Sequence, residues 1–301
     1  MNEPRWMGGP PKTVLLATDL SPRCDRALDR AVSLAELWQA NLVILHVLED
    51  TRSWASDTIV PSWRRPPDPF GLAQRRLIDD IGAVADTATI VIDEGNPADA
   101  IQRTAEERGC DLIITGVARD EPLGRFVLGT TVDRLLRSSH LPVLVVKNRA
   151  RRRYRNVLVA TDFSESSRHA LEAAARYFPL QKLTIFHAYD PPMSAFATDP
   201  ASNRREYRKV AEQEYEAFLK STPSEDLIRK HAHPLIEFGT PSQLLRECVR
   251  DMNIDLAVLG THGRSTLFEV LIGSVAKQIM AELPCDALVI REPAALPQST
   301  G

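Results

Sequence analysis

The chain alternates short runs of apolar, often β-branched residues with longer amphipathic stretches. Continuous apolar runs of this length are typical of strands that are covered on both faces of a parallel sheet. We predict strands near 13–18, 42–48, 88–93, 111–115, 143–147, 156–161, 183–189, 232–238, 255–259 and 287–291. We predict helices near 22–38, 71–85, 97–108, 130–138, 165–177, 203–220, 241–251 and 274–282. This alternation indicates an α/β fold built from βαβ units.

The order of motifs in the first half returns in the second half. Three pairs of segments carry the repeat: Val14–Ser21 with Val157–Ser164, Asp111–Gly116 with Asp255–Gly260, and Leu128–Thr130 with Ile272–Ser274. The members of these pairs are 143, 144 and 144 residues apart. A conserved order and spacing over this distance indicates a duplicated domain. We therefore predict two homologous domains, 1–150 and 151–301.

Several helix starts are marked by capping residues. Ser21 precedes a proline, and Asn96 precedes Pro97, which places proline at the first helical position, where its missing N–H costs nothing. Thr240 and Gln243 have the spacing of a capping box. We therefore expect helices to begin directly after Ser21, Asn96 and Thr240.

Composition narrows the class of protein. The 301 residues carry 37 basic and 40 acidic side chains, so a nucleic-acid domain with a basic surplus is not indicated. The five arginines within 148–155 favour a solvated linker over a nucleic-acid patch.

No apolar run reaches the length of a membrane span, and the start of the chain lacks the pattern of a secretory signal. Four scattered cysteines are typical of reduced thiols. We expect a cytoplasmic protein that does not enter a membrane.

Two histidines, His231 and His233, have the spacing of a pair on one face of a strand. Metal sites usually need a third protein ligand, and the sequence places none nearby. We therefore expect no metal site formed by protein side chains.

The most informative motif follows the strand predicted at 255–259. It reads G-x2-G-x9-G-S and comprises Gly260, Gly263, Gly273 and Ser274. The first two glycines let backbone N–H groups approach an anion without a Cβ in the way. Gly273 and Ser274 open the next predicted helix, whose free N–H groups and positive dipole end suit a phosphate. The motif therefore predicts a phosphate-binding loop.

Other residues belong to the same edge of the predicted sheet. Ligands of open parallel sheets bind beyond the carboxyl ends of the strands. Asp162 lies at that end of one strand and Ala188 at that end of the next, so both are candidates for the opposite wall. His262 and Arg264 lie within the glycine loop and can add donors.

These motifs resemble the universal stress protein family in its tandem form, with two domains in one chain. The resemblance rests on Ala160–Ser164, on His187-Ala188 and on the full glycine pattern, and it extends over nearly all of both halves. It implies two tandem five-stranded parallel open sheets, strand order 3-2-1-4-5, with helices on both faces. Family members with the glycine pattern bind ATP. The implied nucleotide site comprises Ala160, Asp162, Ala188, Leu259, Gly260, Gly263, Arg264, Gly273, Ser274 and Val275. The resemblance also implies that domains pair through the fifth strand.

The first half departs from this pattern at the second glycine. Its loop has Gly116, then Arg119 in place of that glycine, then Gly129 and Thr130. A long side chain now occupies the place of close backbone approach, although an arginine can itself bind a phosphate. The weaker candidate site comprises Asp19, Val47, Gly116, Arg119, Gly129 and Thr130.

We therefore expect a nucleotide-responsive stress or regulatory module that binds ATP, with Mg²⁺, mainly in the second domain. We expect no catalytic residues, because the motif fixes no base that would position a water, although slow ATP hydrolysis stays open. Two alternatives remain. One is an interaction scaffold, or a binder of another small ligand, and the other is an ATP-using enzyme. The expected partners are an adenine nucleotide and a second copy of the chain in a homodimer.

Overall fold

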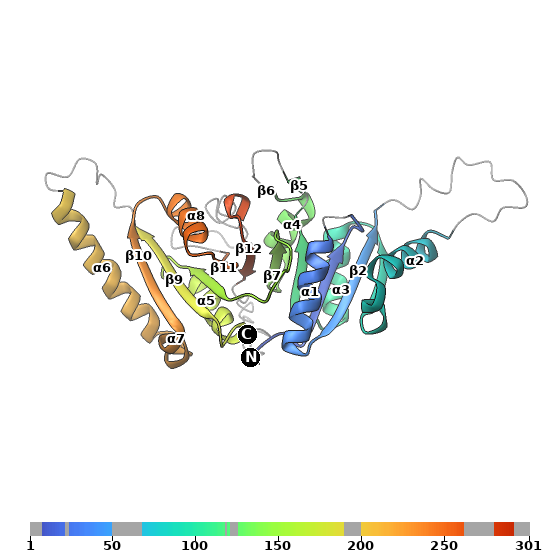
Figure 1. The fold of residues 1–301 in the computed structure, drawn as a ribbon, viewed down its shortest axis with the longest axis horizontal. Helices are drawn as coiled ribbons and strands as arrows, with labels where there is room; N and C mark the ends of the chain where they lie inside the picture. Colours follow the sequence, from blue (N-terminus) through green and yellow to red (C-terminus); the bar gives the residue numbers. More distant parts are fainter. Residues whose placement is uncertain are drawn as a thin grey trace, which may run out of the picture.

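The computed structural model describes residues 8–21, 24–49, 68–117, 119–120, 126–189, 200–261 and 280–291. The two halves lie side by side (Figure 1). Their strands form one ten-stranded sheet in the order β10-β9-β8-β11-β12-β7-β4-β1-β2-β3. The β-strands of the first half are β1 (Thr13–Thr18), β2 (Asn41–Leu48), β3 (Thr89–Glu94), β4 (Leu112–Gly116) and β7 (Val143–Val146). Those of the second half are β8 (Asn156–Ala160), β9 (Lys182–Tyr189), β10 (Ala232–Phe238), β11 (Leu256–Gly260) and β12 (Asp286–Ile290).

Each half has the strand order 3-2-1-4-5 with parallel pairing throughout. This confirms the predicted α/β fold. The two sheets are not separate, however, because β12 pairs with β7 in antiparallel orientation, with Leu288 opposite Leu144. A short second sheet pairs β5 (Arg119–Asp120) with β6 (Phe126–Val127).

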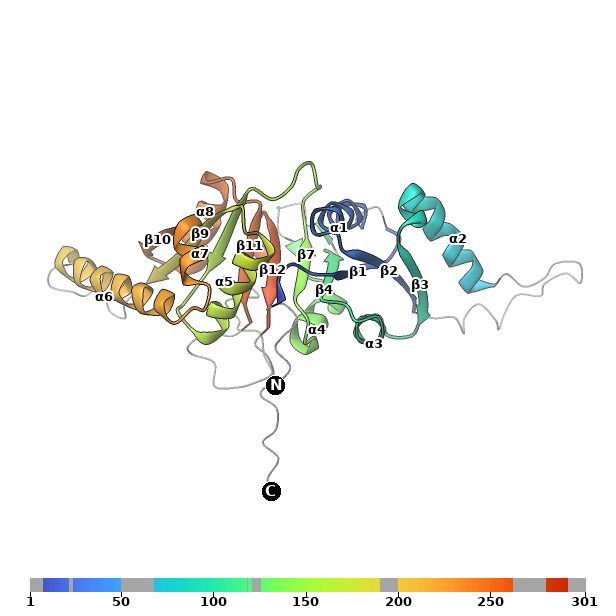
Figure 2. The same ribbon diagram turned by 90° about the horizontal axis from the view of Figure 1, so that it is seen from below.

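Helices cover both faces of the sheet. They are α1 (Asp25–Trp38), α2 (Pro69–Ile81), the 3₁₀ helix η3 (Gly82–Asp86), α3 (Pro97–Glu107), α4 (Thr130–Ser138), α5 (Glu165–Tyr177), α6 (Pro200–Lys220), α7 (Glu225–His231) and α8 (Pro241–Asp251). In the first half, α1 and α2 lie on one face and α3 and α4 on the other (Figure 2). Neighbouring strand residues alternate between two buried clusters, with Val14 and Leu16 in one and Leu15 in the other.

The helix starts test the capping predictions. Asn96 does cap α3, because its side chain accepts hydrogen bonds from the N–H groups of Ala98 and Asp99. Ser21 does not cap α1, since its carbonyl accepts a bond from the Cys24 N–H and α1 begins only after Cys24. Thr240 precedes α8 as predicted, but its side chain makes no capping hydrogen bond.

The prediction of a shared strand face for His231 and His233 is wrong. His231 ends α7, a helix that the sequence pattern did not predict, while His233 lies in β10. Across the described ranges, no group of three or more potential ligand side chains could hold a metal ion.

Two arginines of the linker contact carboxylates within the chain. Arg149 lies 3.6 Å from Asp29, and Arg152 lies 3.4 Å from Asp255. In the described parts of the chain, no helix has both the length and the apolar character needed to span a membrane.

Candidate functional site

A cavity opens at the carboxyl ends of β1, β2 and β4 in the first half. Its volume is about 200 Å³, and the first turn of α4 closes one side. The lining residues are Ala17, Thr18, Asp19, Cys24, Leu45, Val47, Glu49, Pro97, Ile101, Thr115, Gly116, Val117, Gly129, Thr130, Thr131 and Val132. Five of the six residues of the weaker sequence-predicted site therefore meet here, at the edge where open parallel sheets bind ligands.

Asp19 is presented by a tight turn directly after β1. Its Oδ1 accepts hydrogen bonds from the Ser21 N–H, at 2.9 Å, and from the Cys24 thiol, at 3.0 Å. Burial opposes ionisation of Asp19, but these hydrogen bonds outweigh it and lower the pKa of the carboxyl group. Burial also raises the pKa of Cys24 to about 11, so its thiol keeps the proton that it donates. Asp19 is therefore a fixed carboxylate in the cavity wall.

The same turn recurs in the second half. Asp162 follows β8, and its Oδ1 accepts a hydrogen bond from the Ser164 N–H at 3.1 Å. The residue after each aspartate has a left-handed backbone, with φ of 58° at Leu20 and 63° at Phe163. Residues with branched or bulky side chains rarely adopt this backbone conformation. Its presence at equivalent positions in both halves indicates that the turn requires it.

Two equivalent histidines stabilise these turns. The Nδ1 of His46 lies 2.9 Å from the Thr18 carbonyl oxygen, and the Nδ1 of His187 lies 2.8 Å from that of Thr161. A carbonyl only accepts, so each Nδ1 carries the proton and donates it. Both histidines are therefore hydrogen-bonded residues at the ends of their strands.

The described part of the second site lies at the corresponding strand ends. Ala160 ends β8 and Ala188 lies in β9, which pairs with β8. On the other side, β8 pairs with β11 up to Val159 and Val258, which places Leu259 beside Ala160. The structure therefore brings the predicted residues Ala160, Asp162, Ala188, Leu259 and Gly260 to one edge of the sheet. The other predicted residues of this site, namely Gly263, Arg264, Gly273, Ser274 and Val275, and the neighbouring His262, lie outside the described residues.

Gly260 has a packing role that the motif alone did not reveal. A Cβ at this position would lie 2.6 Å from the Ser166 Oγ and 2.8 Å from the Ser166 carbonyl carbon and oxygen. Backbone atoms cannot move aside as a flexible side chain can. The end of β11 therefore contacts the first turn of α5 only because residue 260 is a glycine.

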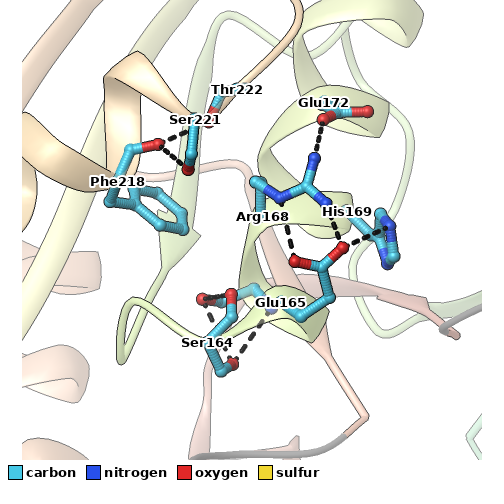
Figure 3. Close-up of polar contacts among 9 residues, drawn as sticks. Ser164, Glu165, Arg168, His169, Glu172, Phe218, Ser221 and Thr222 are labelled. Atoms are coloured by element: carbon cyan, nitrogen blue, oxygen red, sulfur yellow. Dashed lines mark hydrogen bonds and ion pairs between the residues drawn. The ribbon is translucent and has the colours of Figure 1, made fainter.

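A polar network, which sequence reasoning also missed, fixes that first turn of α5 (Figure 3). The Ser167 N–H donates to the Ser164 Oγ at 3.3 Å, which caps the helix. Arg168 pairs with Glu165, one turn earlier, and with the buried Glu172, at 2.9 Å. The network begins two residues after Asp162, so it holds the turn that presents this aspartate. The only signal in the sequence was the i, i+3 and i, i+4 spacing of the charges around Arg168.

The first-half cavity has a distinct charge pattern. Among the described residues, its lining holds the carboxylates of Asp19 and Glu49, hydroxyl groups, and no lysine, arginine or histidine. Gly129 precedes the first turn of α4 and provides no side-chain cap. The N–H groups of that first turn are therefore available as hydrogen-bond donors to a ligand. Arg119 opens the β5–β6 hairpin, and its side chain is outside the described structure.

Comparison with known proteins matches both halves to one family. The sequence profile described as "Universal stress protein family" matches residues 11–147 and again residues 153–291. Among curated proteins, the chain is similar to the universal stress protein E homolog of Haemophilus influenzae. The two are 25% identical over 214 residues, which cover 67% of this chain and 68% of that protein.

Solved structures show the same fold. A Pseudomonas aeruginosa protein described as functionally unknown has a TM-score of 0.65 at 19% identity, and the match covers 97% of this chain and 95% of that chain. A universal stress protein from Archaeoglobus fulgidus has a TM-score of 0.61 at 19% identity, covering 93% and 98%. At this level of identity the likeness establishes the tandem arrangement and fold alone.

Proposed function

Because the chain belongs to the universal stress protein family, we propose that it binds an adenine nucleotide, ATP with Mg²⁺, in its second half. The observation that carries this proposal is the convergence of Ala160, Asp162, Ala188, Leu259 and Gly260 at one edge of the sheet. The glycine and serine pattern continues directly from Gly260. A carboxylate can bind the hydroxyl groups of a ribose, and backbone N–H groups can bind a phosphate chain. Apolar strand ends can pack against a purine ring.

The preference for the second half rests on two differences between the halves. The second glycine of the loop is retained as Gly263 in the second half but is Arg119 in the first. The residues that follow this position also differ, because the first half has Asp120 and Glu121 where the second half has Arg264 and Ser265, and negative charge beside the loop repels a phosphate chain. We therefore propose that the first half contributes little to nucleotide binding.

We further propose that the protein acts as a nucleotide-responsive regulatory module of the cytoplasm and not as an enzyme. The support for this is in the sequence, where the glycine motif fixes no base that would position a water. A homodimer is the oligomeric state that we expect, since closed two-fold dimers are common among soluble proteins.

Titration calorimetry with Mg-ATP tests this proposal. We expect one site per chain in the parent protein and loss of binding in Gly263→Asp, because an added carboxylate blocks the approach of phosphate. The matched control is Arg119→Asp at the equivalent position of the first half, which should keep the second site. Absence of binding in the parent, or equal loss in both variants, would contradict the proposal.

A further inference from the structure

The two halves meet where β7 and β12 pair, and each of these strands is followed directly by a basic residue. Lys147 follows β7, and Arg291 follows β12. The two strands are antiparallel, so the end of each lies beside the start of the other. Lys147 therefore lies beside the segment that precedes β12, and Arg291 lies beside the segment that precedes β7. In each case this segment is the end of a helix in the other half.

Lys147 reaches the end of a helix in the second half. Its side chain is fully buried, and Nζ donates to the carbonyl oxygen of Met280 and, at 2.9 Å, to that of Leu283. Residues 280–282 are the described last turn of the helix predicted at 274–282. That helix begins in sequence at Ser274, in the phosphate motif.

Arg291 makes the reciprocal contact in the first half. Its guanidinium donates to the carbonyl oxygens of Arg137 and, at 3.4 Å, of Ser139, at the end of α4. Arg291 is 144 residues after Lys147, and Leu283 is 144 residues after Ser139. The contacts to Leu283 and Ser139 are therefore equivalent under the duplication, although one uses lysine and the other arginine.

The chemistry of helix ends explains why these positions carry cations. The last carbonyl groups of a helix have no partners within it, and the helix dipole places negative charge there. A cation that binds these carbonyls fixes the axial position of the helix. For α4 this also fixes the opposite end, where Gly129 and Thr130 line the first-half cavity.

We propose that Lys147 and Arg291 are positioning residues that act across the domain interface. Arg291 holds the carboxyl end of α4, whose first turn lines the first-half cavity, and Lys147 holds the carboxyl end of the helix predicted at 274–282, which follows the glycine pattern in the sequence. Each pocket then depends on a residue supplied by the other domain, which couples the two halves of the tandem chain. The part that concerns ATP rests on the function proposed above, whereas the helix contacts do not.

Hydrogen exchange of the full chain, without ligand, tests the contacts themselves. In Arg291→Met we expect amide exchange within 130–139 to rise roughly tenfold, the factor that one charge-assisted hydrogen bond provides, with 280–283 unchanged. In Lys147→Met we expect the reverse pattern, and Arg291→Lys should retain most of the protection at 130–139. Equal exchange in parent and variants, or equal acceleration of both segments in either variant, would overturn the proposal. If Lys147→Met does not fold, Arg291→Met decides the question alone.

A second measurement separates positioning from general stability. In Lys147→Met we expect the Kd for Mg-ATP to rise several-fold while the Kd for adenosine, which lacks phosphates, stays unchanged. Arg291→Met, whose contact serves the first half, should leave both values unchanged. Equal weakening of ATP and adenosine would overturn the positioning role. If the parent binds neither ligand, the proposed function fails, and the exchange pattern still decides the helix contacts.

Discussion

The pH dependence of stability provides a quantitative test of the buried Lys147. Burial disfavours the charged form and lowers the pKa of Lys147 from 10.5 to about 8, although the nearby Cys285 and Asp286 partly oppose this shift. The unfolded chain therefore binds more protons than the folded chain between about pH 8 and 10.5. Stability should rise with pH across this window, because the unfolded state is the one that retains the proton.

The size of the effect follows from the shift. Each pKa unit corresponds to about 1.4 kcal/mol, so the lysine contributes a rise of about 3 kcal/mol in the free energy of unfolding across the window. Lys147→Met removes the titrating group and should remove this rise. The neighbouring thiol acts with the opposite sign, because burial raises the pKa of Cys285 from 9.0 to about 12. Both proteins contain Cys285, so its contribution largely cancels in the difference.

The assay is denaturant unfolding of the parent and Lys147→Met at half-unit steps from pH 7 to 10.5. The difference in unfolding free energy, parent minus variant, should increase by about 3 kcal/mol between pH 8 and 10.5. A difference that stays flat, or that falls as the pH rises, would refute the argument that Lys147 is held in a desolvated site.

Two further predictions concern stability. Gly260→Ala should destabilise the protein by about 1–3 kcal/mol even without ligand, because the new Cβ meets the Ser166 backbone; unchanged unfolding in denaturant would contradict that packing. Asn96→Ala should cost about 1 kcal/mol through the lost cap of α3. The matched change Thr240→Ala, at the equivalent position, should cost much less because Thr240 forms no cap bond, and equal costs in the two variants would count against this assignment.

The sequence pattern was sufficient to predict the strands, and the family resemblance of the motifs implied the order of the sheet. The run 13–18 has an apolar centre flanked by threonines, and the predicted and observed bounds coincide for 13–18 and for 232–238. The duplication then allowed each half to support the interpretation of the other. Local chemistry was less decisive, since Ser21 and Thr240 have capping residue types but only Asn96 has the geometry.

Long-range contacts were beyond the reach of sequence patterns. The packing of Gly260 against Ser166 joins residues far apart in the chain, and a glycine in a loop motif does not reveal which of its neighbours requires it. The contacts of Lys147 and Arg291 depend on the antiparallel pairing of β7 with β12. A single basic residue after a strand carries no signal of such a partner. In the sequence alone, the two positions were unremarkable.

The most direct test of the central claim is to denature the purified protein and identify the released small molecules by mass spectrometry. We predict ATP or ADP at close to one molecule per chain from the parent and none from Gly263→Asp. Two molecules per chain would mean that Arg119 does not close the first site. No nucleotide, together with no change in melting temperature on adding Mg-ATP, would contradict adenine nucleotide binding and favour an interaction scaffold.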